Sequence, residues 1–188
     1  MTIYQELTIL LWIAHEILWG LLSRGNKETA VMGRRAPRTI ALIGIGLGFI
    51  LLYTPKSVLG TIATSVLPES GLVEGLGLAI CVIGLLFAWW ARKTLGTNWS
   101  GEVTIKKDHE LIERGPYTVV RHPIYTGLII AFLGTAVAMT RLSGFVGAAL
   151  MFIGILAKVK EEETLLASQF VSYDNYCRRV RKIIPYLY

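Results

Sequence analysis

The side chains best suited to chemistry gather in residues 115–127, a polar segment between two long apolar runs. Its Gly115-Pro116 pair predicts a turn, and Pro123 suits the first position of a new helix. Arg121 and His122 would then lie where that helix leaves backbone N–H groups unpaired, an arrangement that binds anions. Because no second His or Cys lies at ligand spacing, His122 is predicted to be a hydrogen-bond donor and not a metal ligand.

A second polar segment, residues 158–163, follows the last apolar run. Only residues 140–144 separate the last two apolar runs, which predicts a tight helical hairpin that returns this segment to the side of residues 115–127. Carboxylates at the C-terminal end of a helix oppose its dipole, so the helix is expected to continue past its three glutamates at 161–163. The plainer alternative is that these glutamates form a solvated helix face.

The chain as a whole has the composition of a membrane protein. It has 188 residues, 53% of them hydrophobic, and a mean hydropathy of +0.54, which is too apolar for an ordinary soluble domain. Five apolar runs approach the roughly 20 helical residues that cross a bilayer. They are residues 5–22, 38–54, 72–91, 124–140 and 142–159. The sequence therefore predicts an all-α polytopic bundle of five transmembrane helices with a polar cap, divided into residues 1–91 and 92–188.

The distribution of charge predicts the orientation. A net charge of +6 is compatible with nucleic-acid binding, but only Lys56 and Arg141 of the 19 basic residues fall on one side of the predicted bundle. The positive-inside rule then places the N-terminus outside and the cap and C-terminus in the cytoplasm. No nucleic-acid partner is expected. The basic run at residues 34–38 could bind anionic headgroups, although topology alone explains it.

Two features inside the apolar runs bear on packing. Glycines four residues apart allow helix backbones to approach closely, and such pairs occur at Gly44 and Gly48 and at Gly71 and Gly75. His15 and Glu16 are ionisable residues inside the first run. Such side chains are costly in a membrane unless they face a partner or a wet cavity, so one of the two should point inward, either to pair with another helix or to contact a substrate.

Several motifs in the C-terminal half resemble those of the isoprenylcysteine carboxyl methyltransferase family. They are Asn98-Trp-Ser100, His109-Glu-Leu-Ile112, Gly115-Pro-Tyr117, Arg121-His-Pro-Ile-Tyr-Thr-Gly127, Glu162-Glu163 before Leu165-Leu166, and the series Phe170, Tyr173, Tyr176 and Arg179-Val180. The resemblance extends from the end of the third apolar run to the C-terminus. It implies S-adenosylmethionine as a methyl donor, held between a cytoplasmic cofactor-binding cap and the last two spans.

The resemblance also implies the roles of individual residues. Cofactor contacts are expected from His109, Glu110, Leu111, Ile112, Tyr117, His122, Pro123, Ile124, Tyr125 and Glu162. Lys158 stands where the family has an arginine near the substrate carboxylate, and a lysine keeps the charge but loses the bidentate fork. Lys158 and Arg121 are the predicted substrate-binding residues, and Lys158 and Glu162 the predicted catalytic ones. The alternative for Lys158 is that it serves as a positive-inside anchor.

The predicted function is that of an integral membrane methyltransferase whose lipophilic acceptor enters from the bilayer. A carboxylate acceptor, such as that of an isoprenylcysteine, is ionised at neutral pH and needs no general base. A phospholipid amine is the nearest alternative and would need one, with Glu162, Glu163 and His109 as candidates. A reductase that uses NADPH is a further alternative, because the tail at residues 176–188 is similar to that of membrane sterol reductases. The last alternative is a non-catalytic lipid-binding bundle. The sequence does not indicate an oligomeric state.

Overall fold

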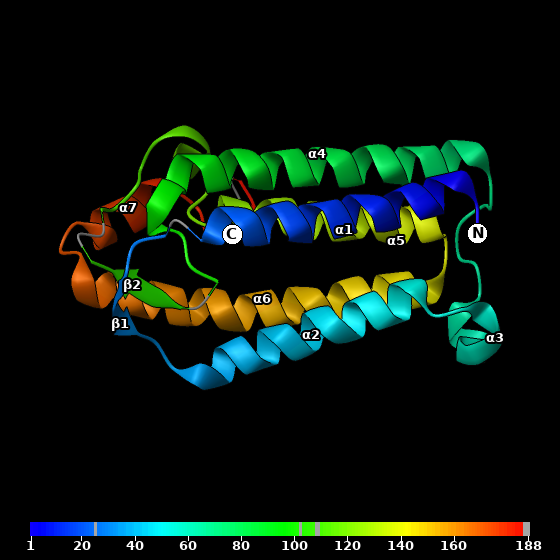
Figure 1. Ribbon diagram of the computed structural model, residues 1–188, viewed down its shortest axis with the longest axis horizontal. Coiled ribbons are helices and arrows are strands. Elements are labelled where there is room, and N and C mark those ends of the chain that lie inside the picture. Colours follow the sequence, from blue (N-terminus) through cyan, green and yellow to red (C-terminus); the bar gives the residue numbers. More distant parts are fainter. Residues whose placement is uncertain (25, 102, 108–109, 186–188) are drawn as a thin grey trace.

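The computed structural model describes residues 1–24, 26–101, 103–107 and 110–185 and is mainly helical. The helices are α1 (Ile3–Ser23), α2 (Arg35–Tyr53), α3 (Lys56–Leu59), α4 (Gly71–Leu95), α5 (Pro123–Met139), α6 (Leu142–Gln169) and α7 (Tyr173–Arg179), with 3-10 turns η1 (Gly60–Ala63), η2 (Gly96–Asn98) and η3 (Gly115–Thr118) and strands β1 (Thr29–Met32) and β2 (Thr104–Lys106). The five long helices lie along the long axis, with the strands and α7 at one end (Figure 1). We call that end the polar end.

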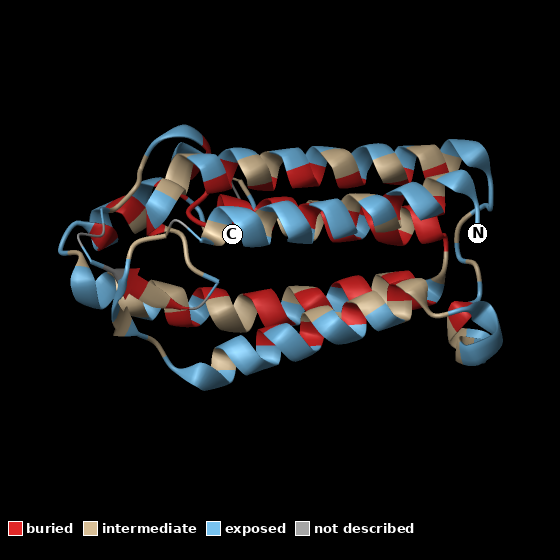
Figure 2. Ribbon diagram, viewed as in Figure 1, coloured by how far each residue is buried: buried red, intermediate tan, exposed pale blue. Residues whose placement is uncertain are grey.

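Four helices, α1, α2, α4 and α6, are long and apolar enough to cross a membrane by length and composition. Helix α5 is apolar but has only 17 residues. Large apolar side chains are exposed on the outward faces, among them Ile13 and Ile17 of α1 and Ile43 and Ile50 of α2 (Figure 2). Such surfaces suit lipid, and the multi-pass membrane architecture predicted from composition is confirmed. Charged residues begin at Lys158, so we treat residues 158–169 of α6 as part of the polar end.

Helices α4 and α5 meet through their backbones. A Cβ built on Gly84 would lie 2.6 Å from the carbonyl oxygen of Gly127, and one built on Gly134 would lie 2.8 Å from the carbonyl oxygen of Gly77. Real Cβ atoms do not come so close to backbone, so only glycine allows this separation of the two helices. The contact fixes α5 against α4 and thereby positions the N-terminus of α5 at the polar end.

The predicted glycine pairs have different outcomes. Gly44 and Gly48 face α6, where built Cβ atoms would lie 2.7 Å from the carbonyl oxygen of Leu150 and 3.0 Å from that of Gly147, so close packing there is confirmed. Gly71 and Gly75 instead face the ring of Tyr4, at ordinary contact distances of 3.4 Å. The predicted backbone approach at that second pair is wrong, because a side chain fills the space.

A short antiparallel sheet departs from the all-α prediction. Strand β1, from the connection between α1 and α2, pairs with β2 so that Val31 lies opposite Ile105 and Met32 opposite Thr104. Just beyond the strands, the N–H of Gly33 donates to the carbonyl oxygen of Val103 at 2.8 Å. Strands of three and four residues are too short to give a periodic signal, which is why the sequence did not reveal them. The sheet ties the N-terminal half to the segment before α5.

Candidate functional site

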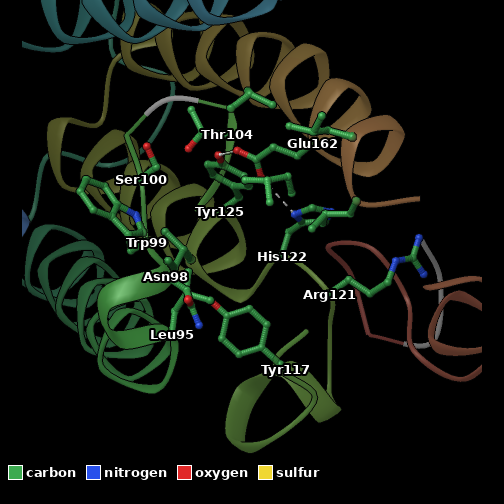
Figure 3. A pocket seen from close by; sticks show the side chains of 15 residues that line it. Leu95, Asn98, Trp99, Ser100, Thr104, Tyr117, Arg121, His122, Tyr125 and Glu162 are labelled. Atoms are coloured by element: carbon green, nitrogen blue, oxygen red, sulfur yellow. Dashed lines mark hydrogen bonds and ion pairs between the residues drawn. The ribbon is translucent and has the colours of Figure 1, made fainter. Parts of the chain in front are cut away.

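A cavity with about 700 Å³ of empty space lies at the polar end. Its lining comes from the end of α4 and the loop after it, from β2, from the turn before α5, and from the first turn of α5 and the late turns of α6 (Figure 3). The lining residues are Leu95, Asn98, Trp99, Ser100, Val103, Thr104, Ile105, Tyr117, Arg121, His122, Ile124, Tyr125, Glu162, Leu165 and Leu166. We call it the donor cavity, because five of the predicted contacts with the methyl donor fall on its lining.

The turn before α5 has the predicted conformation. Gly115 adopts a φ of 58°, a left-handed conformation that favours glycine, and Pro116 is the second residue of the 3-10 turn η3. His122 is the N-cap of α5 and Pro123 its first residue, as the sequence predicted. The hairpin between α5 and α6 then returns α6 to the polar end, where Tyr125 and Glu162 are hydrogen-bonded. The predicted approach of residues 115–127 to residues 158–163 is therefore confirmed.

Glu162 is the central anion of the donor cavity. The hydroxyl of Tyr125 donates to its Oε1 at 2.5 Å, the Nδ1 of His122 lies 3.6 Å from its Oε2, and the Nζ of Lys158 lies 4.0 Å from its Oε1. Burial alone would raise the pKa of Glu162, but the His122 ring, the Lys158 charge and the Tyr125 hydroxyl outweigh burial and hold that pKa below its usual value. The side chain is therefore a carboxylate at neutral pH.

Arg121 is fully engaged on the other side of the same turn. Its Nε and Nη2 donate to Oε1 of Glu163 at 2.9 and 2.6 Å, and its Nη1 donates to the carbonyl oxygens of Cys177 and Val180. Lys182 adds a contact of 3.0 Å to Glu163. Burial raises the pKa of Glu163, but hydrogen bonds from His122, Lys182 and Arg121 outweigh it and bring that pKa to about 2. Through these contacts, Arg121 and Glu163 hold the C-terminal segment against the turn before α5.

His122 lies between the two carboxylates, and this arrangement predicts a pH dependence. Burial lowers the pKa of His122, but Glu162 and Glu163 outweigh it and raise that pKa above 6.5. Protonated His122 then contributes stability that is complete below pH 6.5 and is lost as pH rises through the raised pKa. We expect the melting temperature of the detergent-solubilised protein to fall as pH rises above about 6.5, more steeply than that of His122→Gln. Equal slopes would contradict this.

Not every predicted cofactor residue lies at the donor cavity. Tyr117, His122, Ile124, Tyr125 and Glu162 line it and Pro123 is buried beside them, whereas His109 lies outside the described residues. Glu110 is exposed. Leu111 packs against Tyr173 and Tyr176, and Ile112 packs against Tyr117 and Ile124. The predicted cofactor contacts of residues 109–112 stay predictions.

Several lining residues between α4 and the end of β2 were not among the predicted site residues. Asn98, Trp99, Ser100 and Thr104 all line it, and Figure 3 shows them grouped with Tyr125 on one side while Arg121 extends away. The Asn98-Trp-Ser100 motif contributed to the resemblance and was the available signal, but no role was drawn from it.

A second cavity, with about 850 Å³ of empty space, lies between α1 and α2 and reaches α5 and α6. Most of its lining is apolar or aromatic, and its polar side chains are His15, Glu16, Arg38 and Lys158. The lining residues are Trp12, His15, Glu16, Trp19, Arg38, Ala41, Leu42, Ile45, Phe49, Trp99, Gly101, Ile124, Tyr125, Leu128, Phe132, Met151, Ile155 and Lys158. We call it the groove.

The two cavities meet at shared residues. Trp99, Ile124 and Tyr125 line both. Lys158 lies at this junction, where its Nζ donates to the carbonyl oxygen of Gly101 at 2.8 Å and stands 5.4 Å from the centre of the Tyr125 ring. A molecule in the groove can therefore approach a molecule in the donor cavity beside one positive charge.

The structure thus defines a multi-pass helical membrane protein with a carboxylate-centred cavity at its polar end. The profile of the isoprenylcysteine carboxyl methyltransferase (ICMT) family matches residues 76–168, and over this segment the chain belongs to that family. A "Probable protein-S-isoprenylcysteine O-methyltransferase" of Oryza sativa subsp. indica is 28% identical over 125 residues, which cover 64% of this chain and 65% of that protein. The "Nickel-cobalt-cadmium resistance protein NccN" of Alcaligenes xylosoxydans xylosoxydans is 28% identical over 115 residues, which cover 60% of this chain and 53% of that protein.

A solved structure is also similar. It is that of the eukaryotic intramembrane Ras methyltransferase ICMT, which matches with a TM-score of 0.56 and 24% identity, over 84% of this chain and 55% of that one. The similarity shows a common fold. The chain spans less than two thirds of the length of these relatives.

Proposed function

We propose that this chain is an integral membrane methyltransferase that transfers a methyl group from S-adenosylmethionine to the carboxylate of a lipophilic acceptor. Residues 92–188 supply the donor cavity, and residues 1–91 complete the groove for the acceptor. In this proposal α5 is the fifth transmembrane helix, and the basic polar end lies in the cytoplasm. The observation that carries the proposal is the junction of the two cavities at Tyr125 and Lys158.

The residues of the donor cavity suit the proposed donor. S-adenosylmethionine supplies a methyl group activated by a sulfonium cation, and it also carries an ammonium group and an aromatic adenine. The Glu162 carboxylate offers a negative partner for a cation, and the rings of Tyr117 and Tyr125 offer faces for adenine or for the sulfonium. His122 holds Glu162 in place and keeps it ionised. Asn98, Trp99, Ser100, Val103 and Thr104 also line this cavity.

The groove suits an acceptor with a long apolar part and one acidic group. Its apolar and aromatic lining would hold the hydrocarbon, and the Lys158 ammonium would attract a carboxylate to the junction. A carboxylate is already a nucleophile at neutral pH, so the protein's role is to align and desolvate the reactants. Arg121 acts here as a positioning residue, since Glu163 and two carbonyl oxygens occupy its guanidinium. The names of the relatives make an isoprenylcysteine the first acceptor to test.

A second candidate acceptor is a phospholipid amine. Glu16 lines the groove, and a carboxylate there can pair with an ammonium group or take a proton from it. Methyl transfer to a protonated amine needs such a base. N-methylation therefore differs from O-methylation in requiring a carboxylate at the groove.

Calorimetric titration of the purified full chain in detergent tests the proposal. We expect heat on addition of S-adenosylmethionine and none on addition of NADPH. Heat with NADPH alone would favour a reductase, and no heat with either would favour a non-catalytic lipid-binding bundle. Labelled methyl donor, offered with a prenylated cysteine and in parallel with phosphatidylethanolamine, then distinguishes the two acceptors.

A further inference from the structure

One buried oxygen in the lining of the donor cavity has no hydrogen-bond partner. Asn98 ends the 3-10 turn η2 that follows α4, and it lines the cavity although it is only 8% exposed. Its Oδ1 is buried, and no group in the described part of the chain hydrogen-bonds to it. A buried acceptor of this kind is unfavourable unless a bound molecule supplies an N–H or O–H. The molecule that fills the cavity should therefore present a hydrogen to Asn98.

The chemistry of the proposed methyl donor narrows down which of its groups meets Asn98. S-adenosylmethionine carries three kinds of hydrogen-bond donor, which are the ammonium, the ribose hydroxyls and the 6-amino group of adenine. The ammonium is a cation, and its match in the cavity is the Glu162 carboxylate. Figure 3 shows Glu162 and Asn98 on opposite sides of the cavity. A molecule that spans the cavity with its ammonium at Glu162 therefore brings its nucleoside to Asn98.

The surroundings of Asn98 favour the base over the ribose. Leu95 and Trp99 lie within three residues of it in the chain and line the same cavity. Both pack with Tyr117 and Ile124 in one hydrophobic cluster. Aliphatic and aromatic surfaces suit a planar purine, whereas the two hydroxyls of a ribose need polar partners. A carboxamide also matches the edge of adenine, because its oxygen accepts from the 6-amino group while its N–H can donate to an adjacent ring nitrogen.

We propose that the Oδ1 of Asn98 accepts a hydrogen bond from the 6-amino group of the donor's adenine and thereby makes the cavity selective for adenine over hypoxanthine. Hypoxanthine has a carbonyl oxygen in place of the amino group, so two acceptors would face each other. Asn98 is in this way a specificity-determining residue and takes no part in the transfer of the methyl group. The inference rests on the proposed function, since it names the part of that cofactor which Asn98 recognises.

Two ligands that differ only in the base test this contact without methyl transfer. They are S-adenosylhomocysteine and S-inosylhomocysteine, which lack the transferable methyl group and carry adenine and hypoxanthine. In isothermal titration of the full chain in detergent, the inosyl ligand should bind at least about tenfold more weakly, as expected when a buried acceptor loses its partner. Equal affinities for the two ligands would overturn the proposal.

Substitutions locate the preference at Asn98. Asn98→Leu removes the acceptor at nearly constant size and should lose most of the preference for adenine, whereas Asn98→Asp keeps an acceptor oxygen and should retain it. If Asn98→Leu does not elute as a folded protein in gel filtration, Asn98→Ala, which adds no bulk, replaces it. Thr104→Val is the matched control, because Thr104 also lines the cavity with a buried Oγ1 that has no partner among the described residues. The preference should persist in Thr104→Val.

The same titrations separate the role of Asn98 from the proposed function. A preference for adenine that persists in Asn98→Leu, or that Thr104→Val removes to the same extent, would overturn the role of Asn98 and leave the methyltransferase proposal standing. If S-adenosylmethionine and both homocysteine ligands fail to bind the wild-type chain, the proposed function and this inference are both wrong.

Discussion

Glu162→Gln is expected to lower the affinity for S-adenosylmethionine by about 100-fold, which corresponds to the loss of a charged partner in a desolvated site. The substitution keeps the size of the side chain and its hydrogen-bonding contact with Tyr125, but it removes the negative charge that faces the donor cavity. It also leaves the positive charge of Lys158 without the Glu162 carboxylate, while His122 keeps Glu163 as a partner. Isothermal titration of the purified variant in detergent measures the effect directly.

The neighbouring residue provides the matched control. Glu161 makes its contacts on another side of α6, where its carboxylate accepts from the backbone N and the Nε of Arg34, both at 2.9 Å. Glu161→Gln makes the same chemical change one position away and should leave the affinity for the donor unchanged, while lowering the melting temperature. A Glu162→Gln protein that binds the donor as tightly as the wild type would remove Glu162 from the proposed site.

Gly134→Ala is expected to prevent α4 and α5 from packing. The new methyl group would lie 2.8 Å from the carbonyl oxygen of Gly77 and closer still to the backbone nitrogen of Cys81. Backbone cannot rotate away as a side chain can, so the helices must separate, at a cost of roughly 3 kcal/mol or more. Since α5 carries His122 and Tyr125 into the donor cavity, donor binding should be lost together with stability. Gel filtration and thermal unfolding in detergent measure both.

Gly46→Ala is the control for this substitution. Gly46 lies in α2, and a Cβ built there meets nothing within 4 Å. Alanine is also the better helix former by about 1 kcal/mol. The variant should therefore be as stable as the wild type or more stable. If Gly134→Ala behaved in the same way, the close backbone contact between α4 and α5 would not exist in the membrane protein.

The fold could be predicted from sequence where it depends on long apolar runs. The predicted ranges of all five long helices fall on α1, α2, α4, α5 and α6 because a continuous apolar run is a strong local signal. The features that the sequence did not predict are contacts between residues far apart in the chain. Strands β1 and β2 depend on a partner far away in sequence, and the close approach of Gly84 to Gly127 depends on which faces of two helices meet. A glycine spacing alone does not distinguish that contact from the one between Gly71 and Tyr4.

In the functional site, too, local signals could be predicted from the sequence, whereas contacts with distant segments could not. Turn chemistry at Gly115-Pro116 and the short hairpin after α5 were enough to bring His122 and Tyr125 to Glu162. Arg121 looked like a free cation in the sequence, since nothing local reveals that the C-terminal segment folds back to supply Cys177 and Val180 as acceptors. Likewise, the sequence indicated that His15 or Glu16 would face inward, but only the packed structure shows that His15 meets Trp89.

The pairing of β1 with β2 has a consequence for recombination between relatives. Strand β1 belongs to the connection between the first two helices, while β2 belongs to the segment that covers the donor cavity. A chimera that takes α1 and α2 from one parent and the remainder from another exchanges one strand without its partner. Chimeras within this family are therefore expected to fold when residues 29–32 and 104–106 come from the same parent. The exchanged helices α1 and α2 then keep the β2 strand that pairs with their own β1 strand.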